Sequence, residues 1–475
     1  MIGYVVRRLG LSTKQCKPPF TQYPVSSIQY PVSSIQCITF TFHNTMRHEP
    51  IDAQLFVSNR QNLVKLLKDK SLAVLNSNDI LPTNADGTLR LIQNSDLFYL
   101  TGIDQEETIL VLFPDFPNEE YREMLFVKET SELIEIWEGH KYTKEEAAAA
   151  SGIANVHWLS EFDGIFNTLM AEAERVYLNT NEHIRASVRV ETRDARFIKS
   201  CQQHYPLHRY ERLAPLMYQL RAIKAEPEIA MQQHACDITE QAFRRVLSFV
   251  RPGVMEYEIE AEYLHEFVRR GSRGFAYEPI VASGANACVL HYLDNHAECQ
   301  DGEVILMDVG AEYGRYYADM SRSIPVNGRF TDRQKKVYNA VLRVQREAMT
   351  LLRPGNTIKE YHKEVGKIME SELIGLGLLD AQEVKQQDEK KPLYRKYFMH
   401  GTSHHLGLDV HDVGNVYHPF ETGMVFTVEP GVYIREERLG IRLENNVVIT
   451  DDGVHDLMRN IPIEAEEIED LMNEG

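Results

Sequence analysis

Four carboxylates and one histidine in the last third of the chain have the types and spacing of a two-metal site. They are Asp308, Asp319, His404, Glu429 and Glu444. Each acid lies beside apolar residues of a strand-like segment, where an unpaired buried carboxylate costs several kcal/mol or gives up its charge. A single acid beside a hairpin is often just solvated, but a set of them in apolar surroundings indicates a compensating cation.

The strand pattern predicts that the acids come in two facing pairs. Apolar residues alternate with others along two segments, EVILMDVG and YYADMSRSI, on either side of a two-residue turn at Tyr313-Gly314. This turn would place Asp308 directly opposite Asp319. Like charges facing each other destabilise a hairpin by ~0.2–1 kcal/mol even when exposed. A turn centred on Glu436-Glu437 would likewise oppose Glu429 and Glu444, unless Pro430 shifts the register.

The chemistry expected of such a group is hydrolysis of an acyl bond. Four carboxylates and one neutral imidazole balance the four positive charges of two divalent ions. A metal pair ~3.5–4 Å apart lowers the pKa of bound water and clamps a tetrahedral intermediate. Oxygen-rich ligation favours two hard ions such as Mn²⁺, although the affinity order alone would permit zinc or cobalt.

Three more histidines and one arginine lie near these acids in the sequence. His291 and His411 occur among glycines that let the backbone run close to a ligand, and an imidazole there can donate to a developing oxyanion. Arg442 can orient a metal-bound carboxylate from behind. We expect His400 at the rim. A lone histidine is more often a packed core or surface residue, so the clustering carries this interpretation.

Composition narrows the class of protein. A chain of 475 residues, 43% of them hydrophobic, suggests two or three domains with sizeable cores. A formal net charge of −19 argues against nucleic acid and an anionic membrane surface as partners. No stretch approaches the ~20 apolar residues of a membrane span. The six cysteines form no CxxC pair, which indicates reduced thiols and a reducing compartment, the cytoplasm.

The first 48 residues differ in kind from the rest. They lack Asp and Glu and repeat QYPVSSI in tandem. We expect residues 1–45 to be a disordered extension or the product of a start site assigned too early, with Met46 as the true initiator. The other interpretation is a basic, acid-poor mitochondrial presequence.

The remaining chain predicts an α/β protein of two domains. Helix-like and strand-like segments alternate from Phe56, which indicates an α/β domain over residues 46–218. A long helix from Arg221 to Arg251 opens the second domain, residues 219–475. This domain contains a faint internal repeat, with the copies FRRVLSFVRPG and REAMTLLRPG. Each copy is followed by a helix and later by a hairpin that carries two of the acids. A pseudo-twofold fold would deliver two carboxylates from each half.

Five ordered motifs resemble the aminopeptidase P (Xaa-Pro aminopeptidase) branch of the creatinase-like, pita-bread metallopeptidases. They are NACVLHYLDN, ILMDVGAEYGRYYADMSRSIPVNGRFT, MHGTSHHLGLDVHDVG, FTVEPGVYI and GIRLENNVVIT. NSDLFYLTG, ILVLFPD and EIWEGHKY resemble the N-terminal domain of the same family. The resemblance implies a creatinase-like α/β domain, then a pseudo-twofold pita-bread α/β domain that carries the catalytic site.

The resemblance also implies roles for the site residues. Asp308 would bind one metal, Asp319 and Glu444 would bridge both, and His404 with Glu429 would complete the other. Glu429 would also shuttle a proton, His291 would assist the tetrahedral intermediate, His411 would contact substrate and Arg442 would brace the site. The sequence departs from the family pattern at the His404-His405 doublet, where spacing from His400 and His411 selects His404, and in the short link REERL.

The implied reaction is release of an N-terminal residue that precedes proline, by a metal-activated hydroxide. An Xaa-Pro bond has no amide hydrogen, so an apolar pocket must recognise the ring. Trp137 is a candidate for this pocket or its rim, because related proteins are homodimers or homotetramers that use a neighbouring N-terminal domain there; core or interface packing is the alternative. A prolidase that cleaves only dipeptides shares the ligands. A methionine aminopeptidase fits less well, and a non-catalytic binding module is a minor alternative because all five ligands are present.

Overall fold

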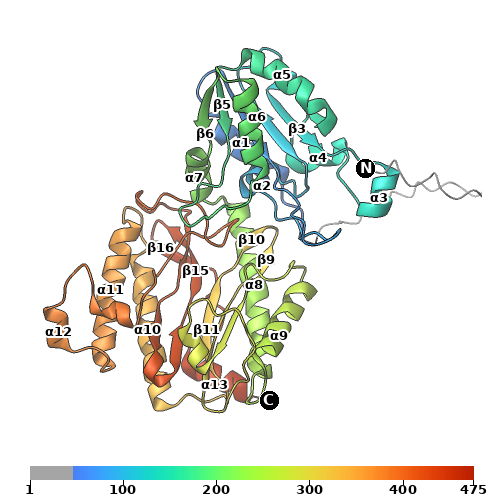
Figure 1. Cartoon of the computed structure of the whole chain (residues 1–475). Coiled ribbons are helices and arrows are strands. Elements are labelled where there is room, and N and C mark those ends of the chain that lie inside the picture. The colour runs from blue at the N-terminus through green and yellow to red at the C-terminus, as the bar shows by residue number, and fades with distance from the viewer. Residues whose placement is uncertain (1–46, 475) are drawn as a thin grey trace, which may run out of the picture. The chain divides into compact units, whose positions relative to one another are not determined.

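The computed structural model describes residues 47–474 of the chain (Figure 1). The segment 1–45, together with Met46 and Gly475, lies outside the described residues, so the predictions for the N-terminal extension are not addressed by the structure. The described residues belong to one unit, Thr45–Gly475, and form two α/β domains with different sheet topologies.

The N-terminal domain is a mixed sheet between two layers of helices. The strand order is β4-β3-β2-β1-β5-β6, with β2 antiparallel to its neighbours β1 and β3 and the pairs β4–β3, β1–β5 and β5–β6 parallel. Its elements are α1 (Ala53–Val64), β1 (Ser71–Asn76), α2 (Ser95–Thr101), β2 (Ile109–Leu112), β3 (Glu123–Val127), α3 (Glu132–Glu138), α4 (Lys144–Ser151), β4 (Val156–Trp158), α5 (Phe162–Glu172), β5 (Arg175–Leu178), α6 (Arg193–His204), β6 (Arg209–Arg212) and α7 (Ala214–Ala222).

Alternation along the strands explains the two layers. In β1, Leu72 and Val74 pack with α5 and α6, whereas Ala73 and Leu75 pack on the other face with α1, α2, α4 and α7. Successive side chains of a strand point to opposite faces, so a strand that is apolar throughout must be covered on both sides. All six residues of β1 are buried, as this arrangement requires.

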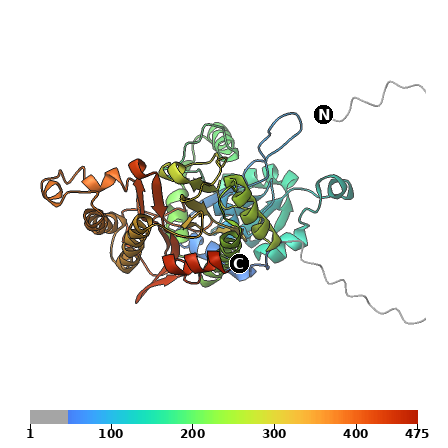
Figure 2. The same ribbon diagram turned by 90° about the horizontal axis from the view of Figure 1, so that it is seen from below.

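The C-terminal domain repeats a helix pair followed by strands. Its elements are α8 (Glu226–Phe249), α9 (Glu256–Arg269), β7 (Ile280–Ser283), β8 (Val304–Val309), β9 (Glu312–Tyr313), β10 (Tyr316–Tyr317), β11 (Met320–Pro325), α10 (Asp332–Leu351), α11 (Ile358–Gly375), α12 (Ala381–Lys385), β12 (Val425–Val428), β13 (Gly431–Ile434), β14 (Leu439–Arg442), β15 (Asn445–Thr450), β16 (Gly453–Asp456) and α13 (Ala465–Asn473). In Figures 1 and 2 the strands lie between the α8–α9 and α10–α11 pairs.

The predicted internal repeat is present in this domain. Both Arg-Pro-Gly sequences end a helix and precede the next one, and their glycines, Gly253 and Gly355, have φ of 90° and 89°. Such a backbone strongly favours glycine, so the motif stops each first helix in the same way. The two halves carry the sheets β11-β8-β7 and β12-β15-β16.

The long helix predicted from Arg221 to Arg251 was wrong at its start. Arg221 belongs to α7, and the chain breaks at 223–225, where Ile223 bridges Met424 and the Lys224 amide donates to Gly423. Pro227 in the first turn of α8 lacks the N–H that a helix continuing from upstream would need.

Candidate active site

The first acid pair comes from the hairpin of β8 and β11, in a register different from the prediction. Asp308 pairs with Ser321, not with Asp319, and the two-residue turn is Gly314-Arg315, where φ is 57° and 73°. The predicted centre of the turn was therefore one residue too close to the N-terminus. Because the pairing shifts by two residues, both acids remain on one face as diagonal neighbours. The hydroxyl of Tyr277 lies 2.5 Å from Asp308 Oδ1 and 2.6 Å from Asp319 Oδ1.

The second acid pair has the predicted register. Gly431 pairs with Arg442 and Val428 with Asn445, so Glu429 and Glu444 lie opposite each other, and the turn is centred on Glu436-Glu437. Pro430 does not shift this register: its carbonyl accepts a hydrogen bond from the Leu443 amide, as the pairing requires.

The structure distinguishes the two adjacent histidines. His404 Nδ1 lies 2.9 Å from the His405 carbonyl, a contact in which Nδ1 must donate, so Nε2 is the nitrogen turned toward the acids. That Nε2 is 3.4 Å from Asp319 Oδ2 and 3.6 Å from Glu429 Oε1. The His405 ring instead packs on Phe426 with centroids 4.2 Å apart. His404 therefore faces the acids and His405 belongs to the core.

Donor atoms of Asp319, His404 and Glu444 lie within 4.8 Å of one another, close enough for one ion. Tyr277 links Asp308 to this group, and the His404 contact links Glu429 to it. The five predicted ligands thus form one buried cluster of four carboxylates and one imidazole. This donor set fits a hard divalent cation.

The electrostatics of the cluster show a surplus of negative charge. Burial, followed by repulsion from Asp319, Glu429 and Asp308, holds the pKa of Glu444 well above its ordinary value. Burial raises the pKa of Glu429 to about 7 and also raises that of Asp308 despite the charge of Arg442. Burial acts to raise the pKa of Asp319, but the hydrogen bond and charge of His404 together with the hydrogen bond from Tyr277 lower it. A bound cation would relieve the surplus.

Arg442 contacts the cluster through its guanidinium. Its guanidinium donates to Asp308 Oδ2 at 2.5 Å, to Ser321 Oγ at 2.8 Å and to the Tyr433 hydroxyl at 2.9 Å. Ser321 Oγ in turn donates to Glu444 Oε2 at 2.8 Å. One arginine therefore fixes an acid from each hairpin.

His400, expected at the rim, lies within the site. Its Nε2 accepts from the Tyr433 hydroxyl at 2.8 Å and its Nδ1 is 3.5 Å from Glu429 Oε2. Burial, followed by the charge of Arg442, lowers its pKa to about 3, so the ring is neutral. Sequence reasoning also missed Tyr277, Ser321 and Tyr433. Ser321 and Tyr433 occupy strand positions beside ligands, a pattern that could have indicated them.

His411 lies against the ligand His404, with ring centroids 4.4 Å apart and nearly perpendicular planes. Burial, followed by the charge of His404, lowers the pKa of His411 to about 3. A neutral imidazole at this place can donate one hydrogen bond to a substrate oxygen.

His291 is exposed, on the segment that follows the short turn η3 (Gly284–Cys288), and its charge contributes to the lowered pKa of His400. The buried carboxylate of Glu256 holds both ends of this segment. It accepts hydrogen bonds from the Ser283 amide and hydroxyl at 2.7 and 2.8 Å, and from Tyr292 and the Ala297 amide at 2.8 and 2.9 Å. Glu256 therefore fixes the segment that carries the exposed His291 on both sides of that residue.

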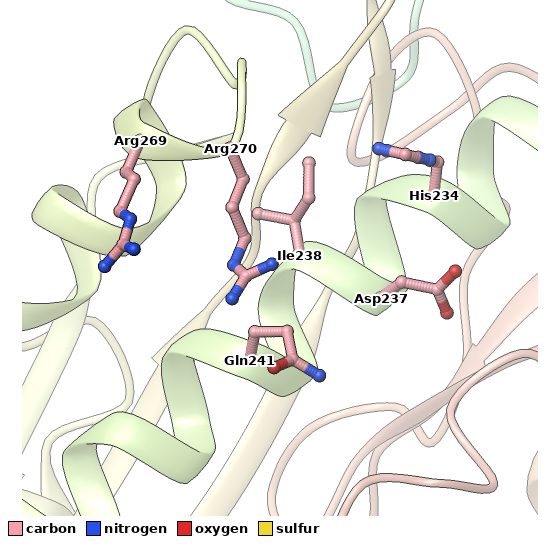
Figure 3. A pocket seen from close by; sticks show the side chains of 6 residues that line it. All are labelled: His234, Asp237, Ile238, Gln241, Arg269 and Arg270. Atoms are coloured by element: carbon pink, nitrogen blue, oxygen red, sulfur yellow. The ribbon is translucent and has the colours of Figure 1, made fainter.

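A groove elsewhere on the C-terminal domain contains none of these residues. It has a volume of about 660 Å³ and lies between α8 and the end of α9 (Figure 3), lined by His234, Asp237, Ile238, Gln241, Arg269 and Arg270. The cluster of buried carboxylates, and not this groove, has the chemistry of a catalytic centre.

Comparisons with known proteins agree with this fold and site. Residues 230–451 match the model of metallopeptidase family M24, and residues 56–177 match the aminopeptidase P N-terminal domain. The chain belongs to family M24 and combines its metallopeptidase domain with that N-terminal domain. The domain boundary predicted after Tyr218 lies between the two matched stretches and stays a prediction.

Within the family the chain is similar to Xaa-Pro aminopeptidases. It is 36% identical to the Xaa-Pro aminopeptidase of Escherichia coli, over 89% of this chain and 98% of that protein. It is 30% identical to Xaa-Pro aminopeptidase 3 of Homo sapiens, over 86% of this chain and 82% of the relative.

Solved structures give the same result. A putative aminopeptidase P from Bacillus anthracis superposes with a TM-score of 0.83 at 34% identity, covering 89% of this chain and 99% of that one. Zinc-substituted E. coli aminopeptidase P in complex with product gives 0.79 at 36% identity with the same coverage. The predicted α/β fold, creatinase-like and then pita-bread, is confirmed.

Two general predictions can also be compared with the described part of the chain. Within residues 47–474 no helix is both long and apolar enough to cross a bilayer. Cys201, Cys236, Cys288 and Cys299 are free and buried, as expected of reduced thiols.

Proposed function

We propose that this chain is a metal-dependent Xaa-Pro aminopeptidase, which hydrolyses the bond between an N-terminal residue and a following proline. The observation that carries the proposal is the convergence of Asp308, Asp319, His404, Glu429 and Glu444 on one buried cluster with a surplus of negative charge. The Xaa-Pro aminopeptidases named above support the choice of substrate.

The cluster would hold two divalent ions, for which we propose Mn²⁺. Asp308, Asp319, His404, Glu429 and Glu444 would hold them. Mostly oxygen donors favour a hard ion, and four carboxylates neutralise two of them. Such ions lower the pKa of water enough to make hydroxide available near neutral pH.

The chain's own residues would move the proton and hold the substrate. Glu429 faces the cluster, with Oε1 3.6 Å from His404 Nε2, and would take a proton from water and pass it to the departing proline nitrogen. His411 and His291 would donate to the substrate carbonyl and to the tetrahedral oxyanion, and Arg442 would keep Asp308 in place.

Recognition of proline would involve a second copy of the chain, in a homodimer or homotetramer. Trp137 lies on α3 with its side chain 81% exposed, which excludes core packing within the described chain. Leu133 and Ile136 on the same short helix are 65% and 70% exposed. An apolar group this exposed is typical of an interface, and it would place Trp137 near the pocket or rim of a neighbouring subunit.

A tripeptide assay separates this function from prolidase activity. An Xaa-Pro aminopeptidase releases the first residue from Xaa-Pro-Yaa, whereas a prolidase leaves the tripeptide intact and cleaves only the dipeptide Xaa-Pro. Xaa-Ala-Yaa serves as the control for proline specificity. Cleavage of the dipeptide alone would move the assignment to prolidase, and cleavage of neither peptide would favour a binding module.

We propose the cytoplasm as the location, in agreement with the free thiols. The mitochondrion becomes the proposal if residues 1–45 are translated and act as a presequence. Fusions of a fluorescent protein to the full chain and to the chain from Met46 onward distinguish the two locations.

A further inference from the structure

Arg221 binds three carboxylates from two domains. Its Nη2 donates to Asp409 Oδ2 at 2.6 Å and to Asp412 Oδ1 at 2.5 Å, and its Nη1 donates to Asp96 Oδ1 at 2.8 Å. The Arg221 side chain is only 4% exposed, so these contacts are scarcely screened by water. Asp409 and Asp412 are the two ends of a four-residue segment whose third residue is His411.

The far end of this segment is held a second time. Lys224 Nζ donates to Asp412 Oδ2 at 2.9 Å, and the Asp412 amide donates to the His405 carbonyl at 2.9 Å. Gly407 makes the close approach possible, because a Cβ there would lie 2.2 Å from Asp412 Oδ2. The backbone on either side of His411 is therefore fixed at short range.

The His411 ring has no anchor of its own in the described chain. Within residues 47–474 no hydrogen bond is made to the ring. It packs against the His404 ring in a T-shaped arrangement, with the centroids 4.4 Å apart. Its place beside the metal ligand must then come from the backbone that carries it. That backbone is set by Asp409 and Asp412.

The other contacts of the cluster lead into the N-terminal domain. Asp96, on α2, also accepts from Asn179 Nδ2 at 2.8 Å, and the neighbouring Ser95 Oγ donates to Asp409 Oδ1 at 2.9 Å. Helix α2 thus contacts the segment Asp409–Asp412 directly through Ser95 and indirectly through Arg221.

We propose that Arg221 is a positioning residue for the reaction: it holds His411 in place by binding both ends of the segment Asp409–Asp412, and it couples that segment to α2. The proposal rests on the substrate contact proposed above for His411. Arginine suits this position because its planar guanidinium offers several donors in fixed directions, whereas lysine is a point charge that cannot reach three carboxylates with defined geometry.

The test uses variants at the outer contacts, which remove little buried charge. Asp409→Asn changes a side chain that is 45% exposed, and Asp96→Asn changes the contact in the N-terminal domain. Glu372→Gln is the matched control, since Glu372 makes a two-point ion pair with Arg343 at 2.9 and 2.6 Å away from the site. Each variant is made in the full Mn²⁺-loaded chain, with and without His411→Ala.

Two readouts decide the matter. Asp409→Asn should lower kcat/KM on Xaa-Pro-Yaa about tenfold or more in the otherwise unchanged chain, and by less than about twofold when His411 is already alanine. Hydrogen exchange of a peptide spanning residues 405–413 should speed up in Asp409→Asn and Asp96→Asn, and stay unchanged in Glu372→Gln.

Equal losses with and without His411 would overturn the positioning role, because the variant would then act on the site as a whole. Unchanged exchange in both acid variants would overturn the anchoring itself. A wild-type chain that released nothing from the tripeptide would instead refute the proposed function, and the exchange measurement would still decide whether Arg221 anchors the segment.

Discussion

At the scale of single residues, hydrogen bonding separates two histidines that the sequence makes neighbours. His404 donates through Nδ1 to a carbonyl and turns Nε2 toward Asp319 and Glu429, whereas His405 packs on Phe426. The same residue type therefore has a ligand's role at one position and a core role at the next.

Replacing each histidine by alanine should separate these roles. His404→Ala should lose most of its affinity for Mn²⁺, because the imidazole nitrogen that lies near both Asp319 and Glu429 is removed. His405→Ala should keep the metal and lose about 1–3 kcal/mol of unfolding free energy, because a buried ring is deleted. Metal content after dialysis and thermal melting measure the two effects, and metal loss in both variants would contradict the assignment.

Glu429 is the residue that we propose to carry the proton. Glu429→Gln keeps the shape of the side chain and an oxygen ligand but cannot take a proton, so kcat should fall by about 10²–10⁴-fold. Glu436→Gln, at an exposed turn position of the same hairpin, is the control. A Glu429→Gln enzyme with near-normal kcat would remove Glu429 from the mechanism.

At the scale of elements, two hairpins deliver the acids, and they differed in how well they could be predicted. The register of the second follows from its centre at Glu436-Glu437, because its apolar residues alternate symmetrically about that point. In the first, Tyr313-Gly314 and Gly314-Arg315 are almost equally plausible from alternation. The actual turn places an arginine in the left-handed region, where non-glycine residues are uncommon.

The close approach of the two strands at Gly310 in the first hairpin predicts the effect of a substitution there. A Cβ at Gly310 would lie 1.8 Å from the Ala318 carbonyl oxygen, between the two acids of this hairpin. Gly310→Ala should therefore destabilise the protein by about 1–3 kcal/mol or more and weaken metal binding.

Gly164→Ala provides the control for that substitution. No atom lies within 4 Å of a Cβ at Gly164, which is in the first turns of α5, so alanine there should stabilise the helix by up to about 1 kcal/mol. Melting temperatures of both variants measure the difference, and a Gly310→Ala protein as stable as the wild type would contradict the described closure.

At the scale of the whole molecule, the sequence indicated which side chains gather in the acid cluster better than it indicated the residues that support them. The five ligands, Arg442 and the repeated helix pair could be found because acids in apolar strands and Arg-Pro-Gly stops leave local patterns. Tyr277, Glu256 and Arg221 could not, because each acts through contacts between distant segments. The break between α7 and α8 was missed for the same reason, since it depends on a bridge from Ile223 to Met424.

Removal of the metal should expose a carboxylate contribution to stability that falls as pH rises, opposite in sign to the contribution of the buried neutral rings of His400 and His411. In the metal-free chain the pKa of Glu429 is raised to about 7 and those of Asp308 and Glu444 are also raised, so the folded state holds protons that the unfolded state releases. This contribution is complete below the ordinary carboxylate pKa and is lost as pH rises through about 7. The lowered pKa of Asp319 acts only at more acidic pH.

Added Mn²⁺ should therefore raise the melting temperature of the chelated protein more at pH 8 than at pH 5. Metal replaces the protons as the compensating charge, so its effect is largest where the protons are gone. Equal stabilisation by Mn²⁺ at both pH values would show that the carboxylates do not carry this charge surplus.

The most direct test of the central claim is a Mn²⁺ titration of the chelated full chain, followed by release of the N-terminal residue from Xaa-Pro-Yaa. A site of four carboxylates and His404 predicts no release without metal and full activity when the protein has bound two ions per chain. Release from the metal-free protein, or no release at any Mn²⁺ concentration, would contradict it.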